Sequence, residues 1–405
     1  MHYLGNERFG MWMTTSSLIA LLSFADLGIG NGLLSSVATA HGRDDREQIR
    51  TLVSSAYSAL SSIALTLLLL LALAYPFVPW HALFNVQSEL ARAEAGPALA
   101  ILVSCFALAI PIGVVQRTQV ALQMGYTASL WQCAASLLGL GGVLLAIRFN
   151  ASLPVLLLAY AGAPLLIGLI NSLVFFLWRR RDLVPSASRI SRCAMGSLTR
   201  TGLLFLVLQV AASVTFMSDN FIIAQKLGAA AVAEYAVPEK LFALVGMVIW
   251  LALSPLWPAY GEAIARGDGD WVRKTLRRSI ILSASVAAVG SSVLLVAAPW
   301  MLHIWVGHAV APPFLLLLGF SVWKVIEAVG QALAMFLNGA RVVGLQVVVG
   351  LLTAIVAIAM KIYLVGEIGV AGAVWATIVS YCVLALAPYY LLWSRVVHPT
   401  STATT

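Results

Sequence analysis

Residues 38–45 have the sequence ATAHGRDD, and residues 263–270, about 224 positions later, have the sequence AIARGDGD. Each stretch is followed by a similar triplet, Arg50-Thr51-Leu52 after the first and Lys274-Thr275-Leu276 after the second. The two matches agree in order and nearly in spacing. The chain is therefore an internal duplication, and this repeat is its main indication of fold.

The similarity between the copies continues upstream. Leu4-Gly5 begins the first copy as Leu227-Gly228 begins the second. An apolar segment, residues 201–224, precedes the second pair, and no equivalent segment precedes the first. We therefore expect the first copy to lack its opening helix.

The composition places the chain in a lipid bilayer. Hydrophobic residues make up 61% of the chain and charged residues 10%, with a mean hydropathy of +0.95. Soluble globular domains are less apolar than this. The apolar stretches are long enough to cross about 30 Å of hydrocarbon as helices and lack the alternation of barrel strands. We predict an all-α integral membrane protein with eleven helices, at residues 9–39, 51–75, 97–121, 127–148, 153–178, 201–224, 237–260, 276–302, 312–338, 342–365 and 368–393.

The basic residues are distributed unevenly between the connections. One alternate set of connections, together with the C-terminus, holds 17 Lys and Arg residues, and the opposite set holds six. Short cytoplasmic loops retain such residues, so the C-terminus is expected in the cytoplasm. This topology and the anionic headgroups of the bilayer account for the net charge of +8, so the charge does not require a nucleic-acid partner.

The repeat and the loops define the expected domains. Residues 1–178 form an N-terminal bundle of five helices, and residues 201–399 form a C-terminal bundle of six. The basic, serine-containing stretch 179–200 is predicted to be a cytoplasmic linker, and 400–405 a disordered tail. Two bundles in the same orientation are related by an axis along the membrane normal, and such halves commonly rock about a central binding site. Transport by alternating access is therefore the expected function.

Enzyme motifs are missing from the sequence. It contains no Walker loop, no His-Glu-x-x-His and no paired-aspartate metal motif, and its four cysteines have no metal-ligand spacing. We expect no cofactor and no metal. A membrane-embedded glycan polymerase or ligase remains an alternative, although the short outer loops disfavour it.

Four polar residues in segment 312–338 are the first candidates for substrate binding. Lys324, Glu327, Gln331 and Asn338 are spaced to lie along one face of a helix. A charge in the middle of a bilayer costs roughly 3 kcal/mol on insertion scales, so charged side chains there tend to face a cavity or a partner. The alternative is a Lys-Glu pair that only fixes helix packing.

A second polar stripe, Gln116, Gln119 and Gln123, lies at the end of segment 97–121. It can bind sugar hydroxyls or simply join neighbouring helices. Arg117 beside it can bind a lipid-linked diphosphate or only extend to the headgroups.

Asp26, Asp219 and Glu327 are candidates for coupling to H⁺ or Na⁺. Asp26 begins the sequence DLGIGNG, whose three glycines predict a kink or an unwound turn. Asp219 follows Thr215 by one helical turn, and these two residues give segment 201–224 a polar side. Transport driven by membrane potential alone is the alternative to ion coupling.

The sequence resembles the O-antigen and polysaccharide flippases of the multidrug/oligosaccharidyl-lipid/polysaccharide exporter superfamily. In the first copy, LGNERFGMW at residues 4–12 and DLGIGNG at 26–32 carry the resemblance. In the second copy, Asp219-Asn220 precedes Leu227-Gly228 and then Val232-Ala233 with Tyr235. The resemblance covers nearly the whole chain.

This resemblance implies a MATE-like fold of twelve helices in two bundles, of which the first helix is missing here. It also implies the translocation of an undecaprenyl-diphosphate-linked oligosaccharide across the bacterial inner membrane, beside a polysaccharide polymerase and chain-length machinery. Lys324 and Arg117 are then expected to bind the diphosphate, and the glutamines to bind the sugars. A cation-coupled drug antiporter of the same superfamily is the main alternative.

Overall fold

The computed structural model describes residues 7–8, 10–12, 14–15, 24–84, 86–306 and 312–388. Within these ranges, nine helices are long and apolar enough to cross a membrane, and a shorter apolar helix spans Ala371–Leu386. The predicted all-α membrane fold is confirmed. The chain forms two compact units, residues 1–206 and 207–405, and the division falls within one helix. Each unit is described by itself.

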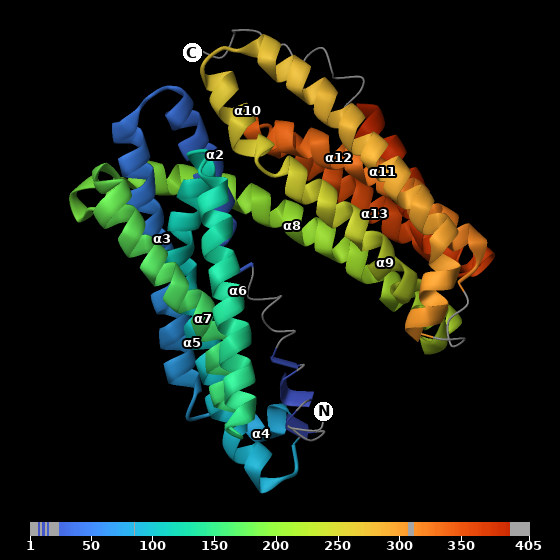
Figure 1. The fold of residues 1–405 in the computed structure, drawn as a ribbon, viewed down its shortest axis with the longest axis horizontal. Helices are drawn as coiled ribbons and strands as arrows, with labels where there is room; N and C mark the ends of the chain where they lie inside the picture. Colours follow the sequence, from blue (N-terminus) through green and yellow to red (C-terminus); the bar gives the residue numbers. More distant parts are fainter. Residues whose placement is uncertain are drawn as a thin grey trace. The chain divides into compact units, whose positions relative to one another are not determined.

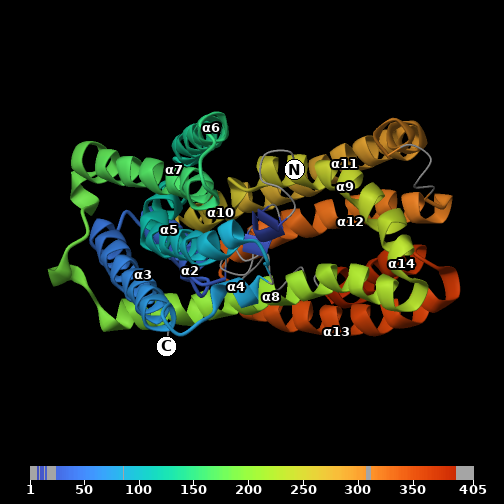
Figure 2. The same cartoon turned by 90° about the horizontal axis from the view of Figure 1, so that it is seen from below.

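The helices of unit 1 pack mainly on α5, the helix at Glu89–Ala121, which contacts α2, α3, α4, α6 and α7 (Figures 1 and 2). The remaining elements are α2 (Ile29–Gly42), α3 (Arg46–Ala74), α4 (Trp80–Leu83), α6 (Gly125–Arg148), α7 (Leu153–Val174), the π-helical turn η1 (Phe175–Arg179), the short 3₁₀ turns η2 (Arg181–Leu183) and η3 (Ala187–Arg189), and the start of α8 (Arg192–Leu227).

Unit 2 contains the rest of α8 and is organised around α12, the helix at Phe314–Gly339, which contacts α9, α10, α11, α13 and α14 (Figure 1). These elements are α9 (Ala229–Leu253), α10 (Leu256–Ala265), α11 (Gly269–Val306), α13 (Val343–Ile368), α14 (Ala371–Tyr381) and the π-helical turn η5 (Cys382–Leu386). The side chains of α12 therefore face other helices of unit 2 on several sides.

The duplication is visible in the turns that carry the repeated sequence. Asp45 donates its backbone N–H to Ala40 at 3.0 Å and caps α3, because its carboxylate accepts from the backbone of Gln48 at 2.9 Å. Asp268 repeats this turn 223 positions later. Its backbone N–H donates to the Ala263 carbonyl oxygen at 3.0 Å, and its carboxylate accepts the backbone N–H of Trp271 at 3.0 Å. The spacing between the two equivalent turns therefore differs by two positions from the spacing between the two similar sequence stretches.

A second pair of equivalent turns ends α5 and α12. Gln123 and Arg341 both have a positive φ, of 62° and 60°, in the turn that follows each helix. In each turn the next residue donates to a carbonyl five positions back, at 2.8 Å from Met124 and 3.0 Å from Val342. The repeat therefore extends through the later helices of both units.

The predicted turn in the glycine-rich segment is confirmed. Asp26 accepts the backbone N–H of Gly28 at 2.8 Å, and Leu27 and Gly28 have φ values of 52° and 71° before α2 begins. A Cβ on Gly28 would overlap the backbone of Gly202 in α8, and a Cβ on Gly202 would lie 2.8 Å from the backbone nitrogen of Ile29. Glycine is required at both positions, because the backbones touch.

The linker is shorter than the sequence predicts. Helix α8 begins at Arg192, so the second half of the 179–200 stretch is helical. Arginine is a good helix former, and a helix can continue beyond the apolar layer while its charged side chains remain solvated. The remaining linker is held on α3, because Ser54 and Ser55 accept backbone N–H groups of Ser186 and Ser191 at 3.1 and 3.0 Å. The predicted tail, 400–405, lies outside the described residues.

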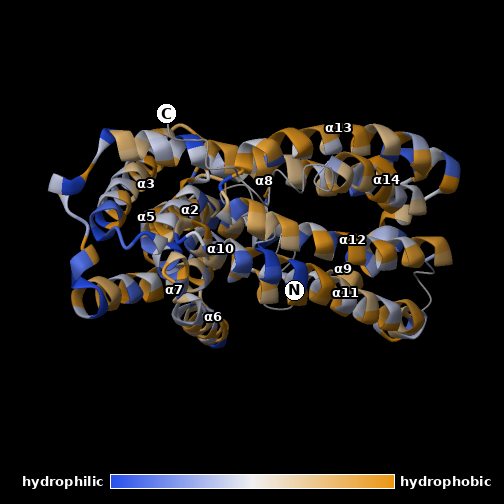
Figure 3. Ribbon diagram, turned by 90° about the horizontal axis from the view of Figure 1, so that it is seen from above, coloured by the Kyte–Doolittle hydropathy of each residue, from blue (hydrophilic) through white to orange (hydrophobic). Residues whose placement is uncertain are grey.

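The surface of each unit is apolar where lipid is expected. Leu130, Leu137 and Leu144 on α6 are more than half exposed. Figure 3 shows apolar colour along the helices and hydrophilic colour at the linker between α7 and α8. Exposure of this kind is expected of a multi-pass membrane protein, whose outer faces contact hydrocarbon.

Candidate functional site

Two adjacent cavities lie inside unit 2. The larger has a volume of about 310 Å³ and is formed by α8, α12, α13 and α14. The smaller has a volume of about 170 Å³ and is formed by α8, α9, α12 and α14. The cavities share Phe216, Trp323, Glu327 and Thr377 in their linings, so they are neighbours. This pair of cavities is the candidate functional site.

Three of the four predicted α12 residues form a hydrogen-bonded row beside these cavities. The Lys324 ammonium donates to Glu327 Oε2 at 2.7 Å, and the Gln331 amide donates to Glu327 Oε1 at 3.2 Å. Glu327 faces both cavities, Lys324 lines the smaller one and Gln331 the larger one. The Gln331 carbonyl oxygen is buried and has no hydrogen-bond partner among the residues that the structure describes. The row therefore combines an internal ion pair with an acceptor available to a hydroxyl or amide donor.

Asn338, the fourth residue, lies apart from this row. It is buried at the end of α12, where its carbonyl oxygen accepts the Gln346 amide of α13 at 3.0 Å. Gln346 itself lines the larger cavity. Asn338 is therefore one contact removed from the cavity, and its role in substrate binding stays a prediction.

Asp219 has a buried cation as its partner. The Lys361 ammonium of α13 lies 2.5 Å from Asp219 Oδ1 and donates to the Thr215 carbonyl oxygen at 2.7 Å. The Tyr235 hydroxyl of α9 donates to Asp219 Oδ2 at 2.7 Å. Lys361 is 0% exposed and Asp219 is 2% exposed, so this network is almost completely buried. It joins α8, α9 and α13 at the wall of the smaller cavity.

Sequence reasoning did not identify Lys361 or Glu239 as site residues. Glu239, on α9, lines the smaller cavity with Asp219 and Lys324. For Lys361 the available signal was a single charge inside an apolar segment, and for Glu239 it was the adjacent pair Glu239-Lys240 near the start of segment 237–260, since charges inside such segments usually face a cavity or a partner. The partner of Lys361 could not be read from the sequence, because Asp219 lies on a helix far away in the chain.

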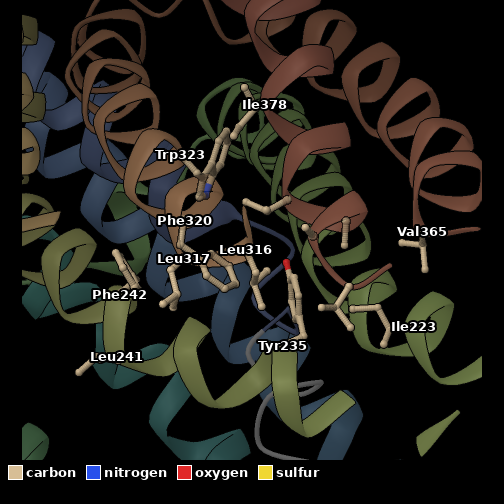
Figure 4. Close-up of a cluster of buried hydrophobic side chains, with 14 of the residues drawn as sticks. Ile223, Tyr235, Leu241, Phe242, Leu316, Leu317, Phe320, Trp323, Val365 and Ile378 are labelled. Atoms are coloured by element: carbon tan, nitrogen blue, oxygen red, sulfur yellow. The ribbon is translucent and has the colours of Figure 1, made fainter. Parts of the chain in front are cut away.

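One wall of the smaller cavity is aromatic. Figure 4 shows the cluster of buried side chains that contains Tyr235, Phe242, Phe320 and Trp323. The rings of Tyr235 and Phe320 lie with centroids 5.2 Å apart, and those of Phe242 and Phe320 lie 5.7 Å apart. This packing fixes Tyr235, so the hydroxyl that donates to Asp219 has a defined position.

The three glutamines of the predicted stripe in unit 1 do not share one environment. Gln119 of α5 is buried and exchanges two hydrogen bonds with Asn171 of α7, at 2.7 and 3.1 Å. Gln116 is exposed on α5. Gln123 is exposed in the turn after the helix. They do not share one hydrogen-bonded row, and their sugar-binding roles stay predictions.

Asp26 and Arg117 both lie close to Gly30. A Cβ at Gly30 would lie 2.9 Å from Asp26 Oδ2 and 3.2 Å from Arg117 Nε. The absence of a side chain at Gly30 therefore leaves room for a carboxylate and a guanidinium over this face of α2. Electrostatic attraction across this gap favours the observed position of Arg117.

The described residues contain no group of three His, Cys, Asp or Glu side chains placed to hold a metal ion. The four cysteines are unpaired.

Sequence comparison places this architecture in a family. The family described as "Polysaccharide biosynthesis protein" matches residues 2–264, which is more than half of the chain. A Yersinia pseudotuberculosis protein named "Putative O-antigen export protein" is 21% identical over 342 residues, a match that covers 82% of this chain and 76% of that protein.

Solved structures show the same fold at low sequence identity. An outward-facing multidrug resistance MATE family transporter of the MOP superfamily matches with a TM-score of 0.83 at 14% identity, over 98% of this chain and 90% of that one. A MOP superfamily transporter from Pyrococcus furiosus matches with a TM-score of 0.79 at 15% identity, over 98% of this chain and 89% of that one. The chain therefore belongs to the polysaccharide biosynthesis protein family, and it has the fold of the MATE transporters.

Proposed function

We propose that this chain moves an undecaprenyl-diphosphate-linked oligosaccharide, an O-antigen or exopolysaccharide repeat unit, from the inner to the outer leaflet of the bacterial inner membrane. Family membership and the transporter fold support a membrane exporter. The name of the Yersinia relative supports a glycan as the exported molecule. The C-terminus would lie in the cytoplasm, as the distribution of basic residues predicts.

The observation that carries this proposal is the row Lys324, Glu327 and Gln331 beside the two cavities of unit 2. A glycan diphosphate cannot cross hydrocarbon without polar partners, because burying its charges and hydroxyls unpaired is costly. Lys324 supplies a cation for the diphosphate, and Gln331 supplies an acceptor for a sugar hydroxyl. The polyprenyl tail would remain in the surrounding lipid.

The other predicted residues have secondary roles in this proposal. Arg117 would receive the diphosphate in unit 1, close to Asp26. The sugar contacts would come from the exposed amides of Gln116 and Gln123, with Gln119 and Asn338 acting through their partners on neighbouring helices.

Membrane potential favours transport in the proposed direction. With the cytoplasm negative, moving two negative charges outward is favoured by about 4.6 kcal/mol per 100 mV, at roughly 2.3 kcal/mol per charge. Alternating access needs a cavity that opens to one side at a time, and the internal duplication predicted from the sequence is typical of transporters that move in this way.

The charges of the smaller cavity favour a second candidate function, the export of cationic drugs. Its lining contains three carboxylates, from Asp219, Glu239 and Glu327, but only one ammonium, from Lys324. A cation-coupled antiporter needs an acidic pocket of this kind. Two of these carboxylates are paired with lysines, which reduces the attraction for a cationic drug. We therefore rank glycan export above drug export.

The test is the sidedness of lipid-linked glycan in cells that lack their own O-antigen exporter. The full chain and a Lys324→Met variant are expressed at matched levels, and a probe that reaches only the outer leaflet detects the glycan. The proposal predicts outward glycan with the wild-type chain and its loss with Lys324→Met. If cells that express the wild-type chain keep the glycan in the inner leaflet and become resistant to cationic drugs, the result would favour the antiporter.

A further inference from the structure

A polar cavity of about 360 Å³ lies in unit 1, where the turn between α2 and α3 meets the linker that follows α7. Its lining consists of Ile49 and five polar or charged side chains, those of His41, Asp44, Arg46, Arg180 and Asp182. None of these residues takes part in the proposed transport. The distribution of basic residues predicts that this end of unit 1 faces the cytoplasm.

Only two of the four charges in this lining form an ion pair with each other. Arg180 donates to both carboxylate oxygens of Asp182, at 3.0 and 2.9 Å. In the described part of the chain, the side chains of Asp44 and Arg46 take part in no ion pair and no hydrogen bond. Arg46 attracts Asp182 from a greater distance, and this attraction contributes to the lowered pKa of Asp182, whose main cause is the hydrogen bond with Arg180. The cavity therefore keeps one carboxylate and one guanidinium available for a ligand.

The neighbouring charges do not fill these two positions. Asp45 caps α3, Glu47 pairs with Arg189, and Arg181 donates to a backbone carbonyl of η1. The other charged side chains of the turn and the linker lie outside the cavity lining; they are Arg43, Arg50 and Arg179.

The equivalent turn of unit 2 folds without these two charges. The N–H of Asp44 donates to a carbonyl three positions back at 3.0 Å, as that of Gly267 does 223 positions later at 3.1 Å. The N–H of Arg46 donates two positions back at 3.1 Å, as that of Gly269 does at 3.0 Å. The turn therefore has the same hydrogen bonds with glycine at both positions.

The backbone of Asp44 also favours glycine. Its φ is 54°, and that of Gly267 is 79°. A side chain at such a φ costs free energy that glycine avoids, and the cap on α3 comes from Asp45. This cost favours a role for the Asp44 carboxylate outside the folding of the turn.

A lipid-facing surface leads to the cavity. Leu173, Leu177 and Trp178, at the end of α7 and in η1, are each more than half exposed, and Arg180 follows them directly. Tryptophan is enriched where hydrocarbon meets the headgroups. Figure 3 shows the corresponding change from apolar colour on α7 to hydrophilic colour at the linker. The cavity is therefore placed at the depth of lipid headgroups.

We propose that this cavity binds the headgroup of a zwitterionic aminophospholipid such as phosphatidylethanolamine. Its phosphate would contact Arg46, because guanidinium groups bind phosphate oxygens strongly. Its primary ammonium would donate to Asp44, since it carries three N–H donors. The headgroup has one charge of each sign, as the available pair has. This inference does not depend on which molecule the chain exports.

The experiment is hydrogen exchange of the purified full chain in nanodiscs of phosphatidylcholine, alone or mixed with phosphatidylethanolamine or phosphatidylglycerol. We expect phosphatidylethanolamine alone to slow exchange in peptides that cover residues 41–49 and 180–183. The quaternary ammonium of phosphatidylcholine has no N–H to donate, and phosphatidylglycerol has no cation for Asp44. The peptide that covers 264–272, in the equivalent turn of unit 2, is the internal reference. Equal exchange in all three membranes, or equal protection by phosphatidylglycerol, would overturn the proposal.

Variants and a soluble probe complete the test. Asp44→Gly takes the residue of the equivalent turn, so it should fold normally and lose the effect of phosphatidylethanolamine. Arg46→Gln should lose it too, whereas Arg266→Gln, in the turn of unit 2, should keep it. Persistence of the effect in Asp44→Gly or Arg46→Gln would contradict the assigned contacts. Soluble phosphoethanolamine added to phosphatidylcholine nanodiscs should not protect these peptides, and full protection by it would show that the ligand is a free phosphate ester and not a lipid.

Discussion

The ammonium of Lys361 lies 2.5 Å from the carboxylate of Asp219, and both side chains are almost completely buried. This pair links α13 to α8, and the Tyr235 hydroxyl extends the link to α9. A buried ion pair of this kind is costly to leave half-formed, since removal of one partner leaves the other charge unpaired. The pair therefore fixes one arrangement of three helices beside the smaller cavity.

We expect Lys361→Met to destabilise the protein by about 3–5 kcal/mol, because the Asp219 carboxylate loses its counter-charge. The double variant Lys361→Met with Asp219→Asn should recover much of this loss, since no charge then remains unpaired. Thermal unfolding of the purified chain in detergent would measure both. Lys240→Met, at an exposed position of α9, is the matched control and should have little effect. If the double variant is less stable than the single one, the pair does not act as an isolated charge pair.

The hydrogen-bonded amides Gln119 and Asn171 should behave as one structural unit. Gln119→Leu leaves the Asn171 amide buried and unpaired, and we expect a loss of about 1–3 kcal/mol. The double variant with Asn171→Leu should cost less than the sum of the two single changes. Chemical denaturation of all four proteins completes the cycle, and strict additivity would contradict the interaction.

A methyl group at Gly30 should affect function more than stability. In Gly30→Ala the new Cβ meets Asp26 Oδ2 and Arg117 Nε, which lie at the ends of flexible side chains and can move aside. We therefore expect a normal protein level and reduced outward glycan in the sidedness assay. Gly141→Ala is the control, because a Cβ there meets no atom within 4 Å. Full activity of Gly30→Ala would argue against a role for this approach of Asp26 and Arg117.

Glu7 should hold the first described residues against the start of α5. Its carboxylate accepts hydrogen bonds from the backbone of Gln87 at 3.2 Å and from the backbone and hydroxyl of Ser88 at 3.0 and 2.6 Å. The Ser88 bonds lower the pKa of Glu7 below 4.5, so this contact is complete at neutral pH and is lost as the pH falls through that lowered value.

We therefore expect Glu7→Gln to increase amide hydrogen exchange at Ser88 at neutral pH, because a neutral amide is a weaker acceptor. The wild-type chain should lose the same protection only in acid, below pH 4.5. Unchanged exchange at Ser88 in the variant would show that the carboxylate does not hold this contact.

The sequence predicts those features that depend on neighbouring residues. The turn at Asp26 follows from its glycines, and the ion pair of Lys324 with Glu327 follows from helical spacing. The helical start of α8 was not predicted, because its basic residues suit a solvated linker equally well. The pairing of Lys361 with Asp219 depends on how distant helices pack, which spacing along one helix does not contain.

The most direct test of the proposed transport uses the purified chain in sealed liposomes that contain undecaprenyl-diphosphate-linked oligosaccharide on both leaflets. A glycosidase added outside digests only the accessible half. If the chain is a flippase, nearly all of the glycan becomes accessible over time with the wild-type protein, while digestion stops near one half with Lys324→Met and with empty liposomes. Digestion that stops near one half with the wild-type protein as well, at a confirmed level of folded and inserted chain, would contradict the account.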